Sequence, residues 1–112
     1  MNPDPTADLN RFAKSRFDAA VAQTFSFEAF DANGGAVSVP LRLDNVQPRK
    51  SPPGLEQFAA CFVGPANPAL AQGSYNASST AFGSDHLFVV PIGFADGARL
   101  YEVCVARHMQ HD

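Results

Sequence analysis

Residues 85–106 read DHLFVVPIGFADGARLYEVCVA, and this stretch decides the fold of the chain. Two runs rich in Val, Ile, Phe and Tyr flank Asp96-Gly97, a dipeptide that forms tight turns between antiparallel strands. The stretch therefore predicts a β-hairpin. Both runs are apolar at consecutive positions, so we expect both faces of the hairpin to be covered by the rest of the chain.

The length and composition of the chain indicate one soluble domain over residues 1–112. A chain of 112 residues has the size of a single domain. Its ten Phe residues and its lack of Trp favour a dry apolar core. The expected class is all-β, as a small antiparallel β-barrel or barrel-like sandwich of about six strands with one N-terminal α-helix.

The charge pattern argues against nucleic-acid and membrane partners. The net charge is −3, and the basic residues are scattered apart from Arg49-Lys50. No apolar run approaches the roughly 20 residues of a membrane span. The N-terminal residues lack the pattern of a secretory signal. We therefore expect a cytoplasmic protein that binds neither nucleic acid nor membrane.

Residues 6–21 carry a helical pattern. Apolar residues recur there at spacings of three and four, at Leu9, Phe12, Ala13, Phe17, Ala20 and Val21. This stripe predicts one amphipathic helix, with Asp4 and Thr6 as alternative caps. We expect the helix to plug an open end of the β domain or to cover one face of its sheet.

Two strands and a loop are predicted next. Residues 24–30 read TFSFEAF and alternate, which predicts a strand with one buried face. Residues 31–35 contain an Asn-Gly turn signal. Residues 37–44 alternate strictly, and Pro40 places that strand at an edge because proline has no N–H to donate. Residues 47–54 contain three prolines and predict an exposed loop, either for binding or only as a connector.

Further segments complete the expected β domain, which spans about residues 24–106. Residues 55–63 predict a strand. Leu70 is expected to point inward from the loop that follows, and a short strand is expected around Tyr75. The small polar residues 76–83 predict a poorly ordered turn.

The two cysteines, Cys61 and Cys104, each lie inside an apolar strand. This position favours buried, reduced thiols, because a free cysteine packs as a small apolar side chain. A disulfide between them is the alternative if their strands are neighbours, although a cytoplasmic setting disfavours it. Nothing in the neighbouring sequence suggests the electropositive site of a catalytic thiol.

The candidate metal ligands lie at the C-terminus, where residues 107–112 predict a frayed tail. His108 and His111 are three apart, a spacing that would place both imidazoles on one helical face. They are candidate metal ligands, but a third ligand has no fixed source. A solvated tail is the favoured interpretation, and we expect no metal and no cofactor.

Catalytic constellations are not predicted. Ser84 and His86 would share one face of a strand and Asp85 would oppose them, so the three cannot form a catalytic triad. Glu102 lies in the most apolar strand and, if buried, would need a cation such as Arg42 or Arg99. We therefore expect a protein that is not an enzyme.

Four short motifs carry a resemblance to a known family. They are GP, QG-x-Y, LF-x-VP-x-G and a DG that is followed by YE, and they fall at residues 64–65, 72–75, 87–93 and 96–102. In this order they resemble a family of small uncharacterised bacterial domains, over roughly residues 17–106. The resemblance implies no catalytic residue. Some members look like companions of phage-tail or secretion-apparatus proteins, which implies an accessory part in a larger assembly.

The motif residues have structural interpretations. They are Gly64, Pro65, Gly73, Tyr75, Pro91, Gly93, Asp96, Gly97, Tyr101 and Glu102. The glycines serve turns or close approaches of the backbone. The prolines end strand pairing or lie at bulges. The tyrosine hydroxyls need hydrogen-bond partners where they are buried.

Two functional hypotheses remain. The first is a non-enzymatic structural or interaction module with a protein partner or a homo-oligomeric state. The alternative is a small β-barrel that binds an apolar ligand in a Phe-lined cavity.

Overall fold

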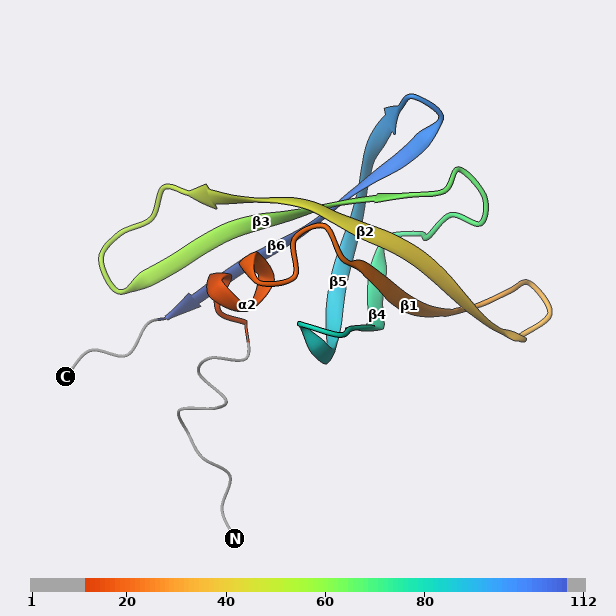
Figure 1. The fold of residues 1–112 in the computed structure, drawn as a ribbon, viewed down its shortest axis with the longest axis horizontal. Helices are drawn as coiled ribbons and strands as arrows, with labels where there is room; N and C mark the ends of the chain where they lie inside the picture. Colours follow the sequence, from red (N-terminus) through yellow and green to blue (C-terminus); the bar gives the residue numbers. More distant parts are fainter. Residues whose placement is uncertain (1–11, 109–112) are drawn as a thin grey trace, which may run out of the picture.

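The computed structural model describes residues 12–108 and shows a mainly β domain. Within that range the elements are α2 (Lys14–Asp18), β1 (Thr24–Phe30), β2 (Ala36–Arg49), β3 (Leu55–Gly64), β4 (Gly73–Ser79), β5 (Gly83–Ala95) and β6 (Ala98–His108). All strand pairs are antiparallel, and the single sheet closes in a ring in the order β1-β2-β3-β6-β5-β4 (Figure 1). The predicted class, with six strands and an N-terminal helix, is confirmed.

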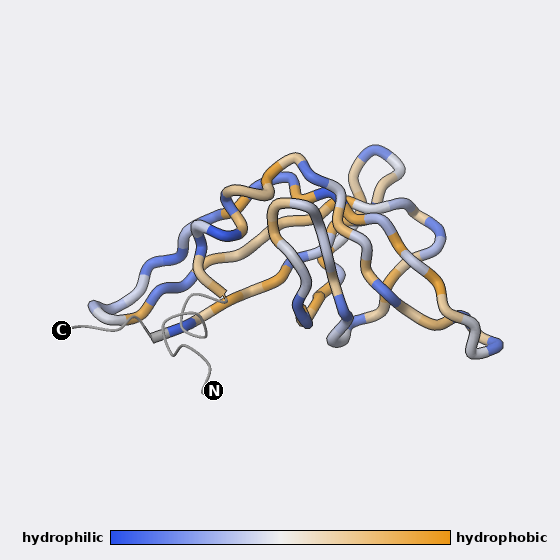
Figure 2. The backbone as a smooth tube through the Cα atoms, turned by 60° about the horizontal axis from the view of Figure 1, so that its bottom comes forward, coloured by the Kyte–Doolittle hydropathy of each residue, from blue (hydrophilic) through white to orange (hydrophobic). Residues whose placement is uncertain are grey.

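Two three-stranded meanders make the ring. The first is β1-β2-β3 and the second is β4-β5-β6, and they meet where β3 pairs with β6 and where β1 pairs with β4. Long hairpins extend beyond the ring in three directions (Figure 1 and Figure 2).

Alternating side chains of the strands, together with Phe17 of α2, fill the interior. The largest fully buried ones are Tyr101, Phe17, Phe25, Phe27, Phe58, Phe62, Leu41, Leu43, Leu87, Val39 and Val89. The ring of Phe62 packs edge-on against Phe25 and Phe27, with centroids 5.1 and 5.4 Å apart. Edge-to-face packing of this kind adds to the stability that apolar burial provides. The core therefore follows the alternation predicted for the first two strands.

The predicted helix over residues 6–21 is wrong in its extent. Residues 6–11 lie outside the described part, and the helix that is described covers Lys14–Asp18 alone. Ala13 has an extended backbone, with φ −67° and ψ 140°, so a continuous helix cannot pass through it. The backbone N–H of Lys14 donates to Glu56 Oε1 at 3.0 Å, a tertiary contact with β3. The apolar stripe is still used, because Ala13, Phe17 and Ala20 are buried.

Three boundary predictions are corrected by longer strands. β2 continues through Arg49, so the loop predicted over residues 47–54 begins only after it. β4 runs to Ser79 and Phe82 is buried, so residues 76–83 are mostly ordered. β6 reaches His108, and Arg107 Nε donates to Glu56 Oε1 at 2.9 Å. The frayed tail predicted over residues 107–112 therefore does not include its first two residues.

The prediction that both faces of the β5–β6 hairpin are covered is wrong. Phe88, Ile92 and Phe94 on β5 are 50%, 51% and 59% exposed. β5 and β6 pair only from Val90↔Glu102 to Ala95↔Ala98, in the part of the hairpin that projects from the ring. Ile92 and Phe94 lie in this projecting part, which has no second layer to cover it, whereas Phe88 is exposed where β5 pairs with β4.

Candidate functional site

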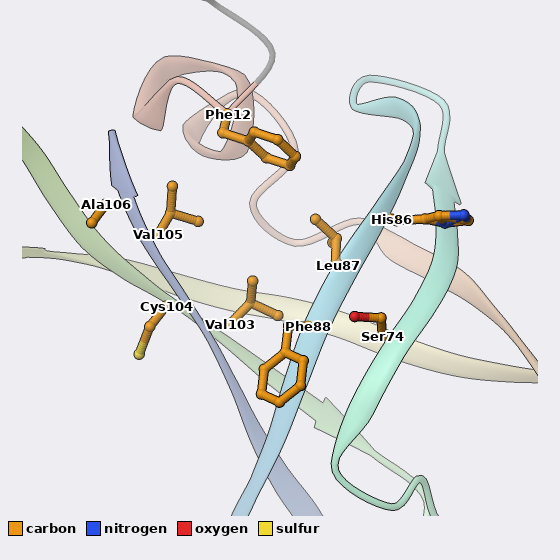
Figure 3. A pocket seen from close by; sticks show the side chains of 9 residues that line it. All are labelled: Phe12, Ser74, His86, Leu87, Phe88, Val103, Cys104, Val105 and Ala106. Atoms are coloured by element: carbon orange, nitrogen blue, oxygen red, sulfur yellow. The ribbon is translucent and has the colours of Figure 1, made fainter. Parts of the chain in front are cut away.

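The candidate site is a groove where β5 and β6 part from each other. The pair Val90↔Glu102 is the last one between β5 and β6. Before residue 90, β5 pairs with β4 alone, and after residue 102, β6 pairs with β3 alone. The open groove between them has a volume of about 270 Å³. Its lining residues are Phe12, Ser74, His86, Leu87, Phe88, Val103, Cys104, Val105 and Ala106 (Figure 3). The groove is therefore built by both hairpin strands, by β4 and by the segment that leads into α2.

The groove has an apolar inner side. Leu87 and Val103 are buried, and their side chains point toward Phe12, which lies across the gap between β5 and β6 (Figure 3). Phe88 and Cys104 point away from that inner side. None of the lining residues is Asp, Glu, Lys or Arg. The groove thus offers apolar surface without an acidic, lysine or arginine side chain.

Exposed apolar side chains continue from the groove along β5. Ile92 lies at the register shift between Pro91 and Gly93, where the extra residue of a bulge is left unpaired. Phe94 is covered on one side by the guanidinium of Arg99, which is 4.3 Å from the ring centroid. Contiguous exposed apolar surface is commonly a site of interaction with another molecule.

Glu102 lies next to the groove on the outer face of β6, and its partner differs from the predicted ones. Arg49 Nη2 donates to Glu102 Oε2 at 3.3 Å, so the cation is neither Arg42 nor Arg99. The other carboxylate oxygen accepts a hydrogen bond from the thiol of Cys104 at 3.0 Å. This hydrogen bond and partial burial raise the pKa of Cys104 above its ordinary value.

Both cysteines are free thiols. Cys104 is exposed, which corrects the prediction that both are buried, and Cys61 is half-buried. Cys61 pairs with Glu102 across β3 and β6, whereas Cys104 pairs with Ala59, so the cysteines are diagonal neighbours. Burial, together with the Glu102 carboxylate, raises the pKa of the Cys61 thiol. Neither thiol has the lowered pKa of a catalytic nucleophile.

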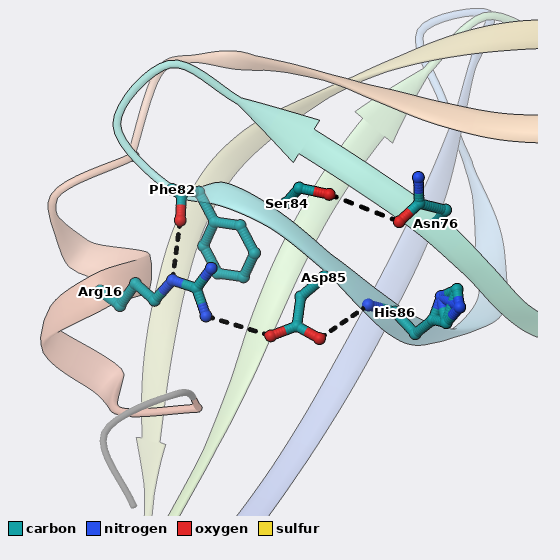
Figure 4. Close-up of polar contacts among 6 residues, drawn as sticks. All are labelled: Arg16, Asn76, Phe82, Ser84, Asp85 and His86. Atoms are coloured by element: carbon teal, nitrogen blue, oxygen red, sulfur yellow. Dashed lines mark hydrogen bonds and ion pairs between the residues drawn. The ribbon is translucent and has the colours of Figure 1, made fainter. Parts of the chain in front are cut away.

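The Ser84-Asp85-His86 stretch is arranged as the sequence predicts. Asp85 is buried whereas Ser84 and His86 are exposed on the opposite face of β5. The Asp85 carboxylate accepts hydrogen bonds from Arg16 Nη1 at 3.2 Å and from the His86 backbone N–H at 2.9 Å (Figure 4). Asp85 therefore anchors α2 to β5, and the geometry of a catalytic triad is not formed.

Several motif residues make hydrogen bonds or take special backbone positions. The Tyr101 hydroxyl accepts a hydrogen bond from the Leu70 N–H at 3.0 Å, and the Tyr75 hydroxyl donates to Ala71 O at 2.7 Å. A Cβ added to Gly64 would overlap the side chain of Leu41, so this glycine serves a close approach. Asp96 and Gly97 have φ values of 53° and 79°, as a tight two-residue turn requires.

The candidate metal ligands are only partly within the described residues. The backbone of His108 is in β6, so the helical spacing that would align it with His111 does not apply there. His111 lies outside the described residues. Among the side chains of residues 12–107, no three His, Cys, Asp or Glu gather as metal ligands would.

The groove itself was not predicted from the sequence. Leu87, Val103 and Val105 have the apolar, alternating character of core strand residues, and nothing local indicates that β5 and β6 separate beside them. The Pro91-Ile92-Gly93 stretch is the one sequence signal, because proline and glycine inside an apolar strand indicate a bulge. The bulge lies immediately beyond the point where the two strands part.

The fold and the groove define a small mainly β domain with an apolar site and without a catalytic constellation among its described residues. Residues 12–105 match the family described as Domain of unknown function (DUF6916), and the chain belongs to that family. Comparisons with curated proteins and with solved structures found no match. Among residues 12–108, no helix could reach across a bilayer.

Proposed function

We propose that this domain is a non-enzymatic interaction module, an accessory part of a larger protein assembly. The observation that carries the proposal is the exposure of Phe88, Ile92 and Phe94 along a single strand. Large apolar side chains lose about 1.5–3 kcal/mol each by remaining in water instead of being buried. A protein partner or a second copy of the chain that covers them would recover part of that free energy.

The position of these side chains supports the same proposal. They follow β5 from the groove to the projecting hairpin, where a partner can reach them without displacing the core. The resemblance to companions of phage-tail and secretion-apparatus proteins suggests the kind of assembly. The cytoplasmic location and the absence of nucleic-acid partners stay predictions.

Native mass spectrometry of the chain, purified alone and from a lysate of its source cell, tests the proposal. We expect a defined oligomer or a specific co-purifying protein with the wild-type chain, and its loss with Phe88→Asp/Ile92→Asp. Phe30→Asp is the matched control, because Phe30 is 77% exposed on a different hairpin. A bare monomer in every sample would overturn the proposal.

The alternative, a domain that binds a small apolar ligand, stays a prediction. The same spectra check it, because a bound ligand would appear as a small extra mass on the monomer. Delipidation followed by a fall in the melting temperature would then identify the ligand as stabilising the native state.

A further inference from the structure

The groove is bordered by two strand edges that lack a strand partner. Residues 103–106 pair with β3 on one side, and residues 86–89 pair with β4 on one side. Among residues 12–108, no strand pairs with the opposite edge of either segment. Backbone N–H and C=O groups along such an edge are available to the backbone of another chain.

The incompletely paired stretches of β2 contain proline. Pro40 lies where the described part of β2 pairs with β1 but not with β3, and Pro48 lies where it pairs with β3 but not with β1. Proline removes a backbone donor and is a common means of protecting a strand edge. Residues 86–89 and 103–106 contain no proline. The strand edges at the groove therefore lack the proline that protects the unpaired stretches of β2.

The chemistry of the groove restricts what could pair there. On its inner side Leu87 and Val103 are buried, Val105 and Phe12 are half-buried over them, and the lining contains no Asp, Glu, Lys or Arg. Moving a charged side chain into such a groove would remove it from water without an opposite charge to compensate. Because side chains alternate along a strand, an added strand would place every second residue against the inner side.

We propose that the groove binds an extended, uncharged peptide segment of a partner protein by strand addition to β6 at residues 103–106. The backbone of the segment hydrogen-bonds the unpaired edge, and its alternate apolar side chains contact Val105 and Phe12, the half-buried apolar side chains of the lining. This inference rests on the proposed function and specifies how the interaction module holds its partner. An edge of four residues is about 13 Å long at roughly 3.3 Å per residue, so a short segment is sufficient.

Hydrogen exchange of the free, full chain is the first test. We expect the amides of residues 103–106 that face the groove to exchange fast, while those that face β3 exchange slowly. Slow exchange of both sets in the monomer would show that the chain covers its own edge and would overturn the proposal. Protection that grows with protein concentration would identify a second copy as the occupant and would also overturn it.

A display library of random heptapeptides, selected against the full chain, is the second test. We expect selected peptides to be uncharged, to alternate apolar residues and to slow exchange at residues 103–106. A selected peptide is then synthesised with N-methyl groups at alternate positions, in two frames. Strand addition predicts at least a tenfold loss of affinity in one frame and at most about a threefold loss in the other, because only every second N–H faces the edge.

Two variants complete the design. Val105→Glu puts a charge on the half-buried inner side of the groove and should weaken peptide binding at least fivefold, whereas Val37→Glu, also half-buried but on β2, should not. Failure to select any peptide, or equal losses in both N-methyl frames, would overturn strand addition. The proposed function would stand in that case if the Phe88→Asp/Ile92→Asp variant still lost its partner or oligomer.

Discussion

Replacing Arg16 by alanine should destabilise the domain more than any comparable change at an exposed arginine. Arg16 Nη1 is 3.2 Å from Asp85 Oδ2, and Arg16 Nε donates to Phe82 O at 2.7 Å. The guanidinium also lies over the ring of Phe82, 3.9 Å from its centroid. One side chain thus links α2 both to the turn before β5, at Phe82, and to β5 itself, at Asp85 (Figure 4).

The expected loss follows from the burial of these partners. The side chain of Asp85 is 3% exposed and that of Arg16 is 24% exposed, so water cannot readily replace the missing cation at the carboxylate. Breaking a buried ion pair by removing one partner costs about 3–5 kcal/mol. The Asp85 carboxylate keeps its hydrogen bond from the His86 N–H, which reduces that cost. We therefore expect Arg16→Ala to lower the free energy of unfolding by about 2–4 kcal/mol.

Urea denaturation measures this loss directly, and Arg42→Ala is the matched control. Arg42 pairs with Asp44 at 3.3 Å, but the two side chains are 54% and 49% exposed. Exposed pairs of this kind contribute at most about 1 kcal/mol. A loss below about 1 kcal/mol for Arg16→Ala, or one equal to that of Arg42→Ala, would refute the argument from burial.

Three further predictions concern single residues. Gly64→Ala should lower the free energy of unfolding by about 1–3 kcal/mol in urea denaturation, because the added Cβ would overlap Leu41. Gly73→Ala is the control: the nearest atoms to its added Cβ are 3.9 Å away, so it should cost less than about 0.5 kcal/mol. Equal losses in the two variants would contradict this argument. Burial alone would raise the pKa of Glu56, but hydrogen bonds from Lys14 and Arg107 hold it below its ordinary value. The folded-state pKa is thus below the unfolded one, so this stabilisation is present above about pH 4.5 and is lost as the pH falls. Glu56→Gln should flatten the fall of the urea midpoint between about pH 5 and pH 3, and an unchanged slope would count against it. Cys104 should react with iodoacetamide at pH 8 more slowly than in the unfolded chain, despite its exposure, because its pKa is raised; equal rates would exclude this cause.

Local sequence signals were sufficient for much of the fold. β1 has the predicted bounds, Thr24–Phe30, because strict alternation and a following turn define a strand without reference to the rest of the chain. The Asp96-Gly97 turn is likewise encoded in two residues, whose positive φ values the structure shows. These elements need no information about distant contacts.

The N-terminal helix shows where local signals fail. Its apolar stripe is real, but the extended backbone of Ala13 and the contact of Lys14 with Glu56 depend on the position of β3. A periodic pattern states which side chains are buried, and it does not state that one continuous helix buries them. Tertiary contacts override helix propensity at such sites.

The groove could not be predicted for a related reason. A run such as Leu87–Val90 has the same composition whether its neighbour is β6 or solvent, so sequence alone does not reveal where paired strands separate. The bulge between Pro91 and Gly93 marks the place, but its effect on the pairing of β5 and β6 is visible only in three dimensions.

The ring closure has a consequence for folding and for native-state opening. β3 and β6 are joined by ten residue pairs, from Leu55↔His108 to Gly64↔Arg99, whereas β1 and β4 are joined by three. Each meander consists of contacts close in sequence and can form early, while both joints must close long loops. Closing a loop costs conformational entropy, and the β1–β4 joint has the fewest hydrogen bonds to offset that cost. The ring should therefore close last, and open first, between Phe27 and Ala77, leaving two meanders hinged along β3 and β6.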